Sequence, residues 1–179
     1  LQAVGIVLGR ISPDLVSVAD PVASVVHLAE LPTADEALAQ GRLLLVVEDN
    51  PVNQLVVRRQ LALLGYAAEA AEDGVEAFAM WHRKDYGLVL TDCHMPNMDG
   101  YQLATAIRDA EAASGRHRRV PIVALTANAM AGEDERCFAA GMDDYLAKPV
   151  PLSVMGQTLG RWLQVDPEGE RAGPPEDAA

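Results

Sequence analysis

Short apolar runs that alternate with helix-like stretches constrain the fold of this chain more than any other feature. Strands are expected at residues 43–47, 67–70, 88–91, 122–125 and 144–147. The run at 43–47 is apolar throughout, as in a central parallel strand that is buried on both faces. Helical patterns follow the strands, at residues 51–64, 74–82, 101–113, 132–140 and 152–163. This alternation predicts a doubly wound α/β domain with a five-stranded parallel sheet and helices on both faces, spanning residues 42–164.

Polar side chains come directly after the strands of this predicted sheet. Glu48 and Asp49 follow the first strand, Asp92 closes the third, Thr126 follows the fourth and Lys148 follows the fifth. The carboxyl ends of parallel strands meet at one edge, where ligands bind in open α/β sheets. We therefore expect three carboxylates, a hydroxyl and an ammonium to gather at that edge.

These groups suit a magnesium-dependent site that accepts a phosphoryl group. The oxygens of Glu48, Asp49 and Asp92 are hard anionic ligands of the kind that Mg²⁺ prefers. A carboxylate such as that of Asp92 can act as the nucleophile and form an aspartyl phosphate. Lys148 and the metal would offset the charge on the phosphoryl oxygens, and Thr126 could hydrogen-bond one of them.

Each of these residues also has an ordinary structural interpretation. Adjacent acids such as Glu48 and Asp49 are favoured at a solvated helix N-terminus by the helix dipole. Lys148 could be a surface lysine at a strand end, and Thr126 could be a β-branched residue that finishes a strand. The site is predicted from their combination, because no single residue would carry it.

Composition excludes several other classes of protein. A formal net charge of −12 at pH 7 argues against a nucleic-acid-binding surface, since neutralisation of phosphates supplies much of that affinity. Cys93 and Cys137 have neither metal-site spacing nor the density of a disulfide scaffold, which favours a reducing cytoplasmic location. The apolar stretches fall short of the ~20 residues that a membrane span needs, so no direct membrane contact is expected.

The chain also has two segments outside the predicted domain. Residues 1–41 are interpreted as an N-terminal extension or linker, or as the remnant of an upstream domain. Residues 165–179 are rich in Pro, Gly, Glu and Asp and are expected to form an acidic flexible tail or linker. Because the chain begins at Leu1 without a basic, apolar leader, we expect a fragment of a longer protein.

Four sequence blocks resemble the receiver domains of two-component signalling, over about residues 42–163. They are VVEDNPVNQ, VLTDCHMPNMDGYQL, PIVALTANAM and GMDDYLAKPV, in that order along the chain. The resemblance implies a flavodoxin-like sheet with the strand order 2-1-3-4-5. It also implies that a phosphohistidine donor phosphorylates Asp92.

The resemblance assigns roles to further positions. Glu48, Asp49, Asp92 and the backbone carbonyl of His94 would hold Mg²⁺. Lys148 would sense the phosphoryl group, and Thr126 and Tyr145 would form a switch pair. His94 and Asn128 would flank the path of a hydrolytic water. Without the resemblance, Tyr145 would be interpreted as an ordinary strand tyrosine.

The amino-acid sequences of these blocks resemble those of receivers that are fused inside hybrid sensor histidine kinases. A parent of that kind could be anchored in the inner membrane, and the donor would be a kinase dimerisation domain or a histidine phosphotransfer domain. The chain shows no nucleotide-binding glycine boxes, so no kinase activity is assigned to it. The domain could also form a homodimer.

Two other functions compete with the phosphorelay interpretation. A magnesium-dependent phosphohydrolase could use Asp92 as a transient nucleophile, but it would want an acid two residues later, where this chain has His94. An interaction domain that is never phosphorylated could keep the same fold. The intact set of acids, threonine and lysine argues against that second alternative.

Overall fold

The computed structural model of the chain describes residues 31–114, 119–127 and 132–163. Within them, five parallel strands form one sheet in the order β2-β1-β3-β4-β5. This order confirms the doubly wound, flavodoxin-like sheet predicted from the sequence. The strands are β1 (Leu44–Val47), β2 (Ala68–Ala71), β3 (Leu88–Asp92), β4 (Ile122–Thr126) and β5 (Asp144–Ala147).

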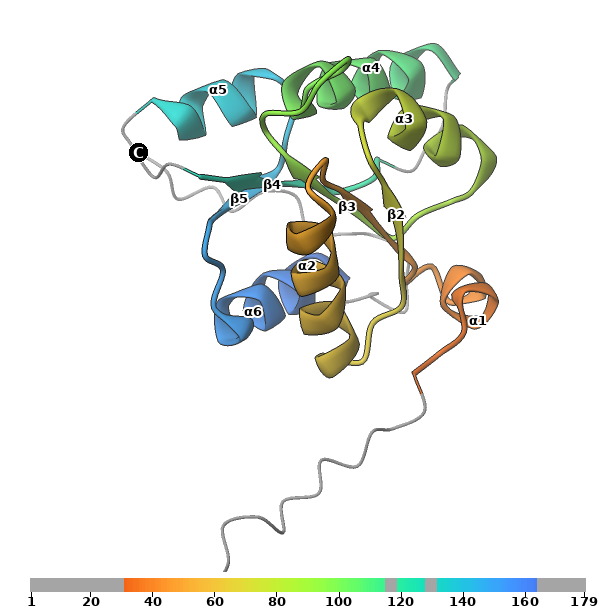
Figure 1. The fold of residues 1–179 in the computed structure, drawn as a ribbon. Coiled ribbons are helices and arrows are strands. Elements are labelled where there is room, and N and C mark those ends of the chain that lie inside the picture. Colours follow the sequence, from red (N-terminus) through yellow and green to blue (C-terminus); the bar gives the residue numbers. More distant parts are fainter. Residues whose placement is uncertain (1–30, 115–118, 128–131, 164–179) are drawn as a thin grey trace, which may run out of the picture.

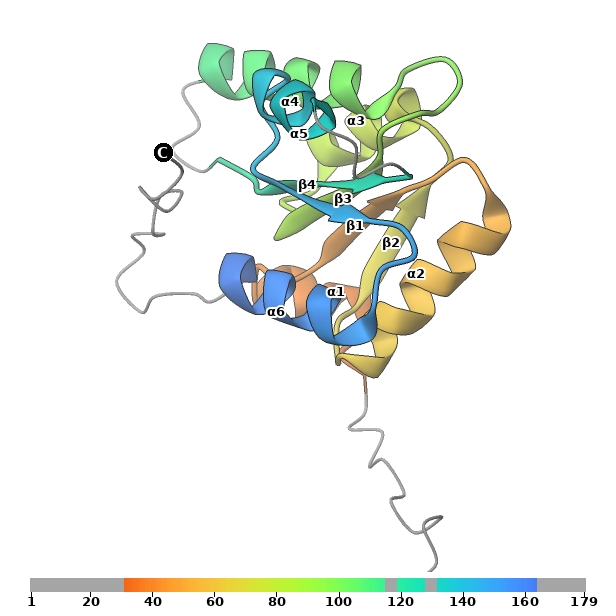
Figure 2. The same cartoon turned by 90° about the vertical axis from the view of Figure 1, so that its left-hand side faces the viewer.

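Helices cover both faces of the sheet. One face carries α3 (Gly74–Arg83), α4 (Gly100–Ser114) and α5 (Glu133–Ala139), and the other carries α2 (Pro51–Leu63) and α6 (Leu152–Leu163) (Figure 1, Figure 2). Every predicted strand and helix of the domain is present, with ends shifted by a residue or so. The sheet therefore has a core on each side, which is the arrangement that apolar central strands require.

Strand β1 shows how the two cores divide. Leu45 and Val47 belong to the core beneath α3, α4 and α5, whereas Leu44 and Val46 belong to the core beneath α2 and α6. All four side chains are fully buried. Because successive side chains of a strand point to opposite faces, a run without polar residues can be buried on both.

The start of α2 fixes the chain beside the carboxyl end of β1. Asn50 is the N-cap, and its side-chain oxygen accepts hydrogen bonds from the backbone N–H groups of Val52 and Asn53. Pro51 occupies the first turn, where its missing N–H costs nothing. The turn into the helix therefore follows immediately after the acidic pair Glu48 and Asp49.

A short helix, α1 (Ala34–Ala39), precedes the sheet and was not predicted. Thr33 and Glu36 form a reciprocal capping box at its start, and the backbone N–H of Arg42 donates to the carbonyl of Ala37. The T-x-x-E pattern is a recognisable helix-start signal. Residues 1–30 of the predicted extension and the predicted tail at 165–179 lie outside the described residues.

None of the helices in the described part of the chain combines the length and the apolar character that crossing a membrane requires.

Candidate functional site

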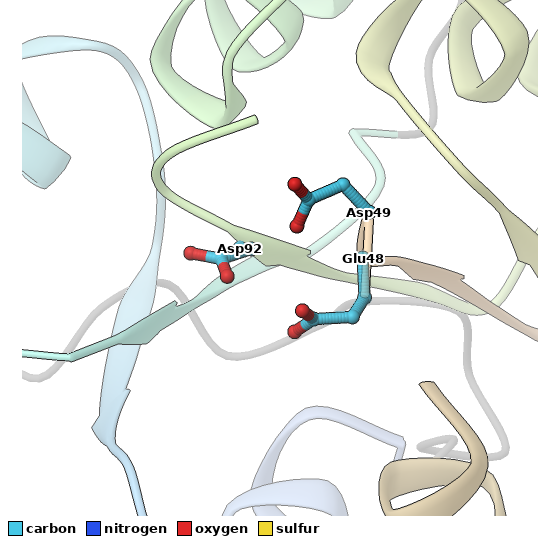
Figure 3. A group of neighbouring side chains, drawn as sticks. All are labelled: Glu48, Asp49 and Asp92. Atoms are coloured by element: carbon cyan, nitrogen blue, oxygen red, sulfur yellow. The ribbon is translucent and has the colours of Figure 1, made fainter. Parts of the chain in front are cut away.

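Three carboxylates meet at the carboxyl edge of the sheet, as the sequence predicted. Glu48 and Asp49 extend from the end of β1, and Asp92 extends from the end of the neighbouring strand β3 (Figure 3). One oxygen from each of the three lies within 4.8 Å of the others. Glu48 is buried, Asp92 is half-buried and Asp49 is exposed. This cluster is open to solvent on the side of Asp49.

Lys148 joins this cluster from the end of β5. Its Nζ atom donates hydrogen bonds to Glu48 Oε2 and to Asp92 Oδ2, each at 2.6 Å. Its backbone N–H donates to the carbonyl of Thr126 at 2.7 Å, which ties the loop after β5 to the end of β4. The Lys148–Pro149 peptide bond is cis, a feature that the sequence could not decide.

The environment of Lys148 keeps its side chain charged. Burial alone would lower the pKa of this ammonium, but the hydrogen bonds to Asp92 and Glu48 outweigh it and leave the pKa raised. Two carboxylates therefore share one fixed cation. Counting Asp49 as well, three negative charges face one positive charge, and the site keeps an excess of two negative charges.

Glu48 is oriented from two sides. Asn53, in the first turn of α2, donates from Nδ2 to Glu48 Oε1 at 3.0 Å, while Lys148 holds Oε2. Sequence reasoning did not single out Asn53. The signal available was its place on the first turn of the helix that begins beside the acidic pair, from which an amide can reach back.

The loop after Asp92 is packed closely against the strand end. A Cβ atom at Gly100 would lie 2.1 Å from the carbonyl oxygen of Asp92, so glycine is required there. Thr91 Oγ1 donates to that same carbonyl at 3.0 Å. Further along the loop, Asn97 Nδ2 donates to Asp73 Oδ2 at 2.7 Å, which fastens the loop to the start of α3. Sequence reasoning assigned no role to Gly100, Asp73 or Asn97.

The remaining predicted residues lie around this centre. Thr126 ends β4 and is buried, and Tyr145 is partly exposed on β5, with its ring 6.2 Å from that of Phe138. His94 donates from its backbone N–H to Asp92 Oδ1 at 3.1 Å. Asn128, the other residue predicted to flank the hydrolytic water, lies outside the described residues.

The fold and the site together define a class of protein. A parallel sheet with clustered carboxylates and a bridging lysine at its carboxyl edge is suited to bind a divalent cation and an oxyanion such as a phosphoryl group. Residues 44–159 match the family model described as the response regulator receiver domain. The chain belongs to that family.

Known relatives agree with this assignment. The chain is 41% identical over 131 residues to the sensor histidine kinase RcsC of Escherichia coli K12, covering 72% of this chain and 13% of that protein. It is 46% identical over 116 residues to the virulence sensor protein BvgS of Bordetella bronchiseptica, covering 64% of this chain and 9% of that protein. The chain thus spans a small fraction of these relatives.

Solved structures resemble the chain over the same domain. The receiver domain of the sensor histidine kinase PA1611 from Pseudomonas aeruginosa PAO1, solved with magnesium in its active-site cleft, has a TM-score of 0.62 and 45% identity. The match covers 69% of this chain and 98% of that one. The yeast Ssk1 receiver in complex with the phosphotransfer protein Ypd1 has a TM-score of 0.62 and 32% identity, covering 67% and 87%.

Proposed function

We propose that the chain is a phosphoacceptor module of a histidine-to-aspartate phosphorelay, and that Asp92 is the acceptor. In the transfer, an oxygen of Asp92 forms a bond to phosphorus while the bond from phosphorus to the imidazole nitrogen of the donor breaks. The observation that carries the proposal is the contact of Lys148 with both Asp92 and Glu48 at 2.6 Å. It supports a centre where an anionic acceptor and a fixed cation face the same incoming group.

The donor set fits Mg²⁺. Glu48, Asp49 and Asp92 offer only carboxylate oxygens, which match a small hard dication, and the excess of two negative charges at the site would be neutralised by it. The backbone carbonyl of His94 is proposed as a further ligand. When bound, Mg²⁺ would stabilise negative charge on the phosphoryl oxygens.

Thr126 and Tyr145 are proposed to form the switch. Thr126 would hydrogen-bond a phosphoryl oxygen, and the space that its side chain vacates would accept the ring of Tyr145. The partly exposed position of Tyr145 beside Phe138 supports this proposal, because the ring occupies an outward position from which it would rotate inward. A phosphoryl group that favours the inward position would then shift the populations of the two conformations of the surface formed by α5 and β5.

The donor is proposed to be a histidine phosphotransfer or dimerisation domain, and the parent a hybrid sensor histidine kinase. Four apolar side chains on the outer surface of α2 are exposed and begin beside the acidic site: Val52, Leu55, Val56 and Leu63. A helical donor that brings its phosphohistidine to Asp92 would meet this apolar stripe. The complex of a receiver relative with Ypd1 supports a partner of this kind.

The docking proposal is tested by comparing phosphorylation by a protein donor with phosphorylation by acetyl phosphate, a small donor that needs no docking surface. Leu55→Asp should slow transfer from a phosphorylated histidine phosphotransfer domain by roughly tenfold, since a carboxylate that is desolvated without a partner at an apolar contact costs more than about 1 kcal/mol. Phosphorylation by acetyl phosphate should stay unchanged. Val75→Asp, an equally exposed site on α3, serves as the matched control. Equal slowing in both variants would place the donor elsewhere.

The proposed acceptor is tested by mass. The chain is incubated with acetyl phosphate with and without Mg²⁺, and a single phosphoryl adduct is expected only with the metal. Asp92→Asn should abolish the adduct, because an amide is a far weaker nucleophile than a carboxylate. An adduct that persists in Asp92→Asn would refute the assignment. Rapid multiple turnover of unrelated phosphoesters would favour the alternative, a magnesium-dependent phosphohydrolase.

A further inference from the structure

Tyr101 lies between the loop that follows Asp92 and the first turn of α5. It is the second residue of α4, which neighbours α5 on one face of the sheet, and its side chain is buried (Figure 1, Figure 2). On one side it meets the His94 ring and shares a buried cluster with Cys93, and these are the two residues after the proposed acceptor. On the other side it contacts the helix next to the proposed switch strand. Its contacts therefore link two parts of the domain that are far apart in sequence.

The contacts toward the site involve Cys93 and His94. The His94 ring meets the Tyr101 ring edge to face, with centroids 6.0 Å apart and an interplanar angle of 82°. Cys93 is buried in the same core cluster as Tyr101 and as Cys137 on α5. Burial raises the pKa of Cys93 to about 12, so this group stays a neutral thiol.

The contacts toward α5 are a hydrogen bond and a cation–π interaction. The Tyr101 hydroxyl donates to Glu133 Oε1 at 2.8 Å, and the Arg136 guanidinium lies 4.2 Å from the centre of the Tyr101 ring. Burial also raises the pKa of Tyr101, which keeps its hydroxyl protonated as a donor. Both contacts fall in the first turn or so of α5.

The start of helix α5 lacks a side-chain N-cap, although Asp134 Oδ1 accepts hydrogen bonds from the backbone N–H groups of Gly132 and Glu135. Its N-cap is Gly132, which has a φ of 104° and makes no side-chain capping hydrogen bond. A side-chain cap typically contributes about 1 kcal/mol to a helix. The contacts of Tyr101 with Glu133 and Arg136 add to these local bonds and tie the first turn of α5 to α4.

We propose that Tyr101 holds α5 in its unphosphorylated arrangement and couples that helix to the loop after Asp92, by a route separate from Thr126 and Tyr145. The proposal rests on the proposed function, since the loop responds to the phosphoryl group on Asp92. Cys93 is packed in the same buried cluster as the Tyr101 ring, and the exposed His94 ring meets that ring from the loop, so a shift of this loop acts on Tyr101. That ring carries the bond to Glu133, so the first turn of α5 responds as well.

The test uses the binding of beryllofluoride, a phosphoryl mimic, to the whole chain in the presence of Mg²⁺. Removing a contact that favours the unphosphorylated state raises the population of the other state and tightens binding of the mimic. A single hydrogen bond of ordinary strength corresponds to a change of roughly two- to tenfold. Tyr101→Phe should therefore bind beryllofluoride more tightly by that factor.

The matched control is Tyr86→Phe. Tyr86 is a second buried tyrosine whose hydroxyl donates to a carboxylate, that of Glu69 on β2, so the same group is deleted away from α5. Its affinity for beryllofluoride should equal that of the wild type. Unchanged or weaker binding in Tyr101→Phe would overturn the coupling, whereas a wild type that binds no beryllofluoride would instead refute the proposed function.

A second readout separates coupling from loss of stability. Amide exchange of residues 133–139 should be faster in Tyr101→Phe than in the wild type before the mimic is added, and the further change on adding it should be smaller. Adding Glu133→Ala to Tyr101→Phe should change neither quantity again, because both substitutions remove the same bond. Additive effects of the two substitutions would contradict a shared route.

Discussion

At the scale of single residues, Lys148 controls the charge balance of the site. Its ammonium bridges two carboxylates that would otherwise repel each other, and it also leaves fewer negative charges for a metal to neutralise. Attraction for a dication and attraction for a phosphoryl oxyanion thus pull in opposite directions at this position. Lysine is a compromise between the two.

Lys148→Ala should therefore have two effects of opposite sign. Mg²⁺ should bind more tightly, because the excess of negative charge at the site rises from two to three, while phosphorylation by acetyl phosphate should slow strongly. Calorimetric titration measures the first quantity and the mass assay measures the second. Lys84→Ala removes an ammonium paired with Glu69 on β2 and should change neither. Weaker Mg²⁺ binding in Lys148→Ala would contradict this account of the charges.

At the scale of elements, the site depends on where each helix begins. Helix α2 starts two residues after Asp49, so that Asn53 in its first turn hydrogen-bonds to Glu48. Helix α4 starts with Gly100, which lies directly against the carbonyl of Asp92. The short link at residues 48–50 and the close approach of Gly100 to Asp92 leave the acidic side chains few alternative positions. The first turns of these helices thus act as the frame of the site.

Two glycines test this frame with the same substitution. Gly100→Ala should destabilise the chain by about 1–3 kcal/mol and slow phosphorylation, because the new Cβ would displace the Asp92 backbone. Gly160→Ala, within α6 where a Cβ has open space, should instead stabilise it by about 0.5–1 kcal/mol. Urea unfolding and the mass assay measure both properties. A neutral Gly100→Ala would show that the loop can shift without cost.

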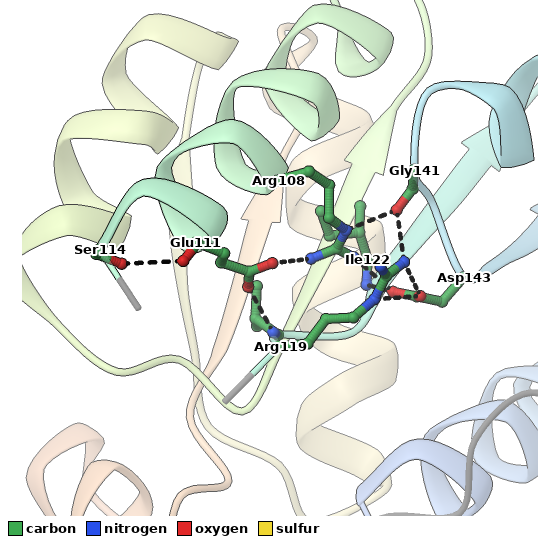
Figure 4. A network of polar contacts seen from close by, with 8 residues as sticks. Arg108, Glu111, Ser114, Arg119, Ile122, Gly141 and Asp143 are labelled. Carbon is green, nitrogen blue, oxygen red and sulfur yellow. Dashed lines mark hydrogen bonds and ion pairs between the residues drawn. The ribbon is translucent and has the colours of Figure 1, made fainter. Parts of the chain in front are cut away.

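At the scale of the whole molecule, a partly buried ion-pair network joins α4 to the amino ends of β4 and β5 (Figure 4). Arg108 donates to Glu111 Oε2 and to Asp143 Oδ2, each at 2.7 Å, and to the carbonyl of Gly141 at 2.8 Å. Asp143 Oδ2 also accepts the backbone N–H of Ile122 at 2.8 Å. The network lies at the opposite end of the strands from the acidic site.

Arg108→Ala should cost about 1–3 kcal/mol of unfolding free energy, because it leaves the buried Glu111 carboxylate without its cation, whereas Asp143 keeps its pair with Arg119. Arg161→Ala breaks an exposed pair with Asp144 and should cost about 0–1 kcal/mol. Unfolding in urea, followed by tryptophan fluorescence, compares the two. Mg²⁺ binding to folded Arg108→Ala should match the wild type, since the network does not touch the site. Similar costs for both variants would mean that the network contributes little.

Much of the fold followed from local patterns. The apolar run at 43–47 and the helical pattern that begins at residue 51 are signals that need no distant partner, and both matched the structure. Helix α1 was missed because its six residues offer little periodicity, although its capping box was readable. Asn53 and Gly100 were missed as parts of the site because their roles depend on what lies opposite them.

The amino-acid sequence by itself determined the alternation of strands and helices, and with it the edge at which Glu48, Asp49, Asp92, Thr126 and Lys148 had to emerge. Side-chain periodicity and turn chemistry are local properties, so they can be recognised in a single chain. Only the tertiary structure decided that one ammonium holds both Glu48 and Asp92 and that Tyr101 reaches Glu133. Those contacts join residues far apart in sequence, and their geometry is set by how the whole core packs.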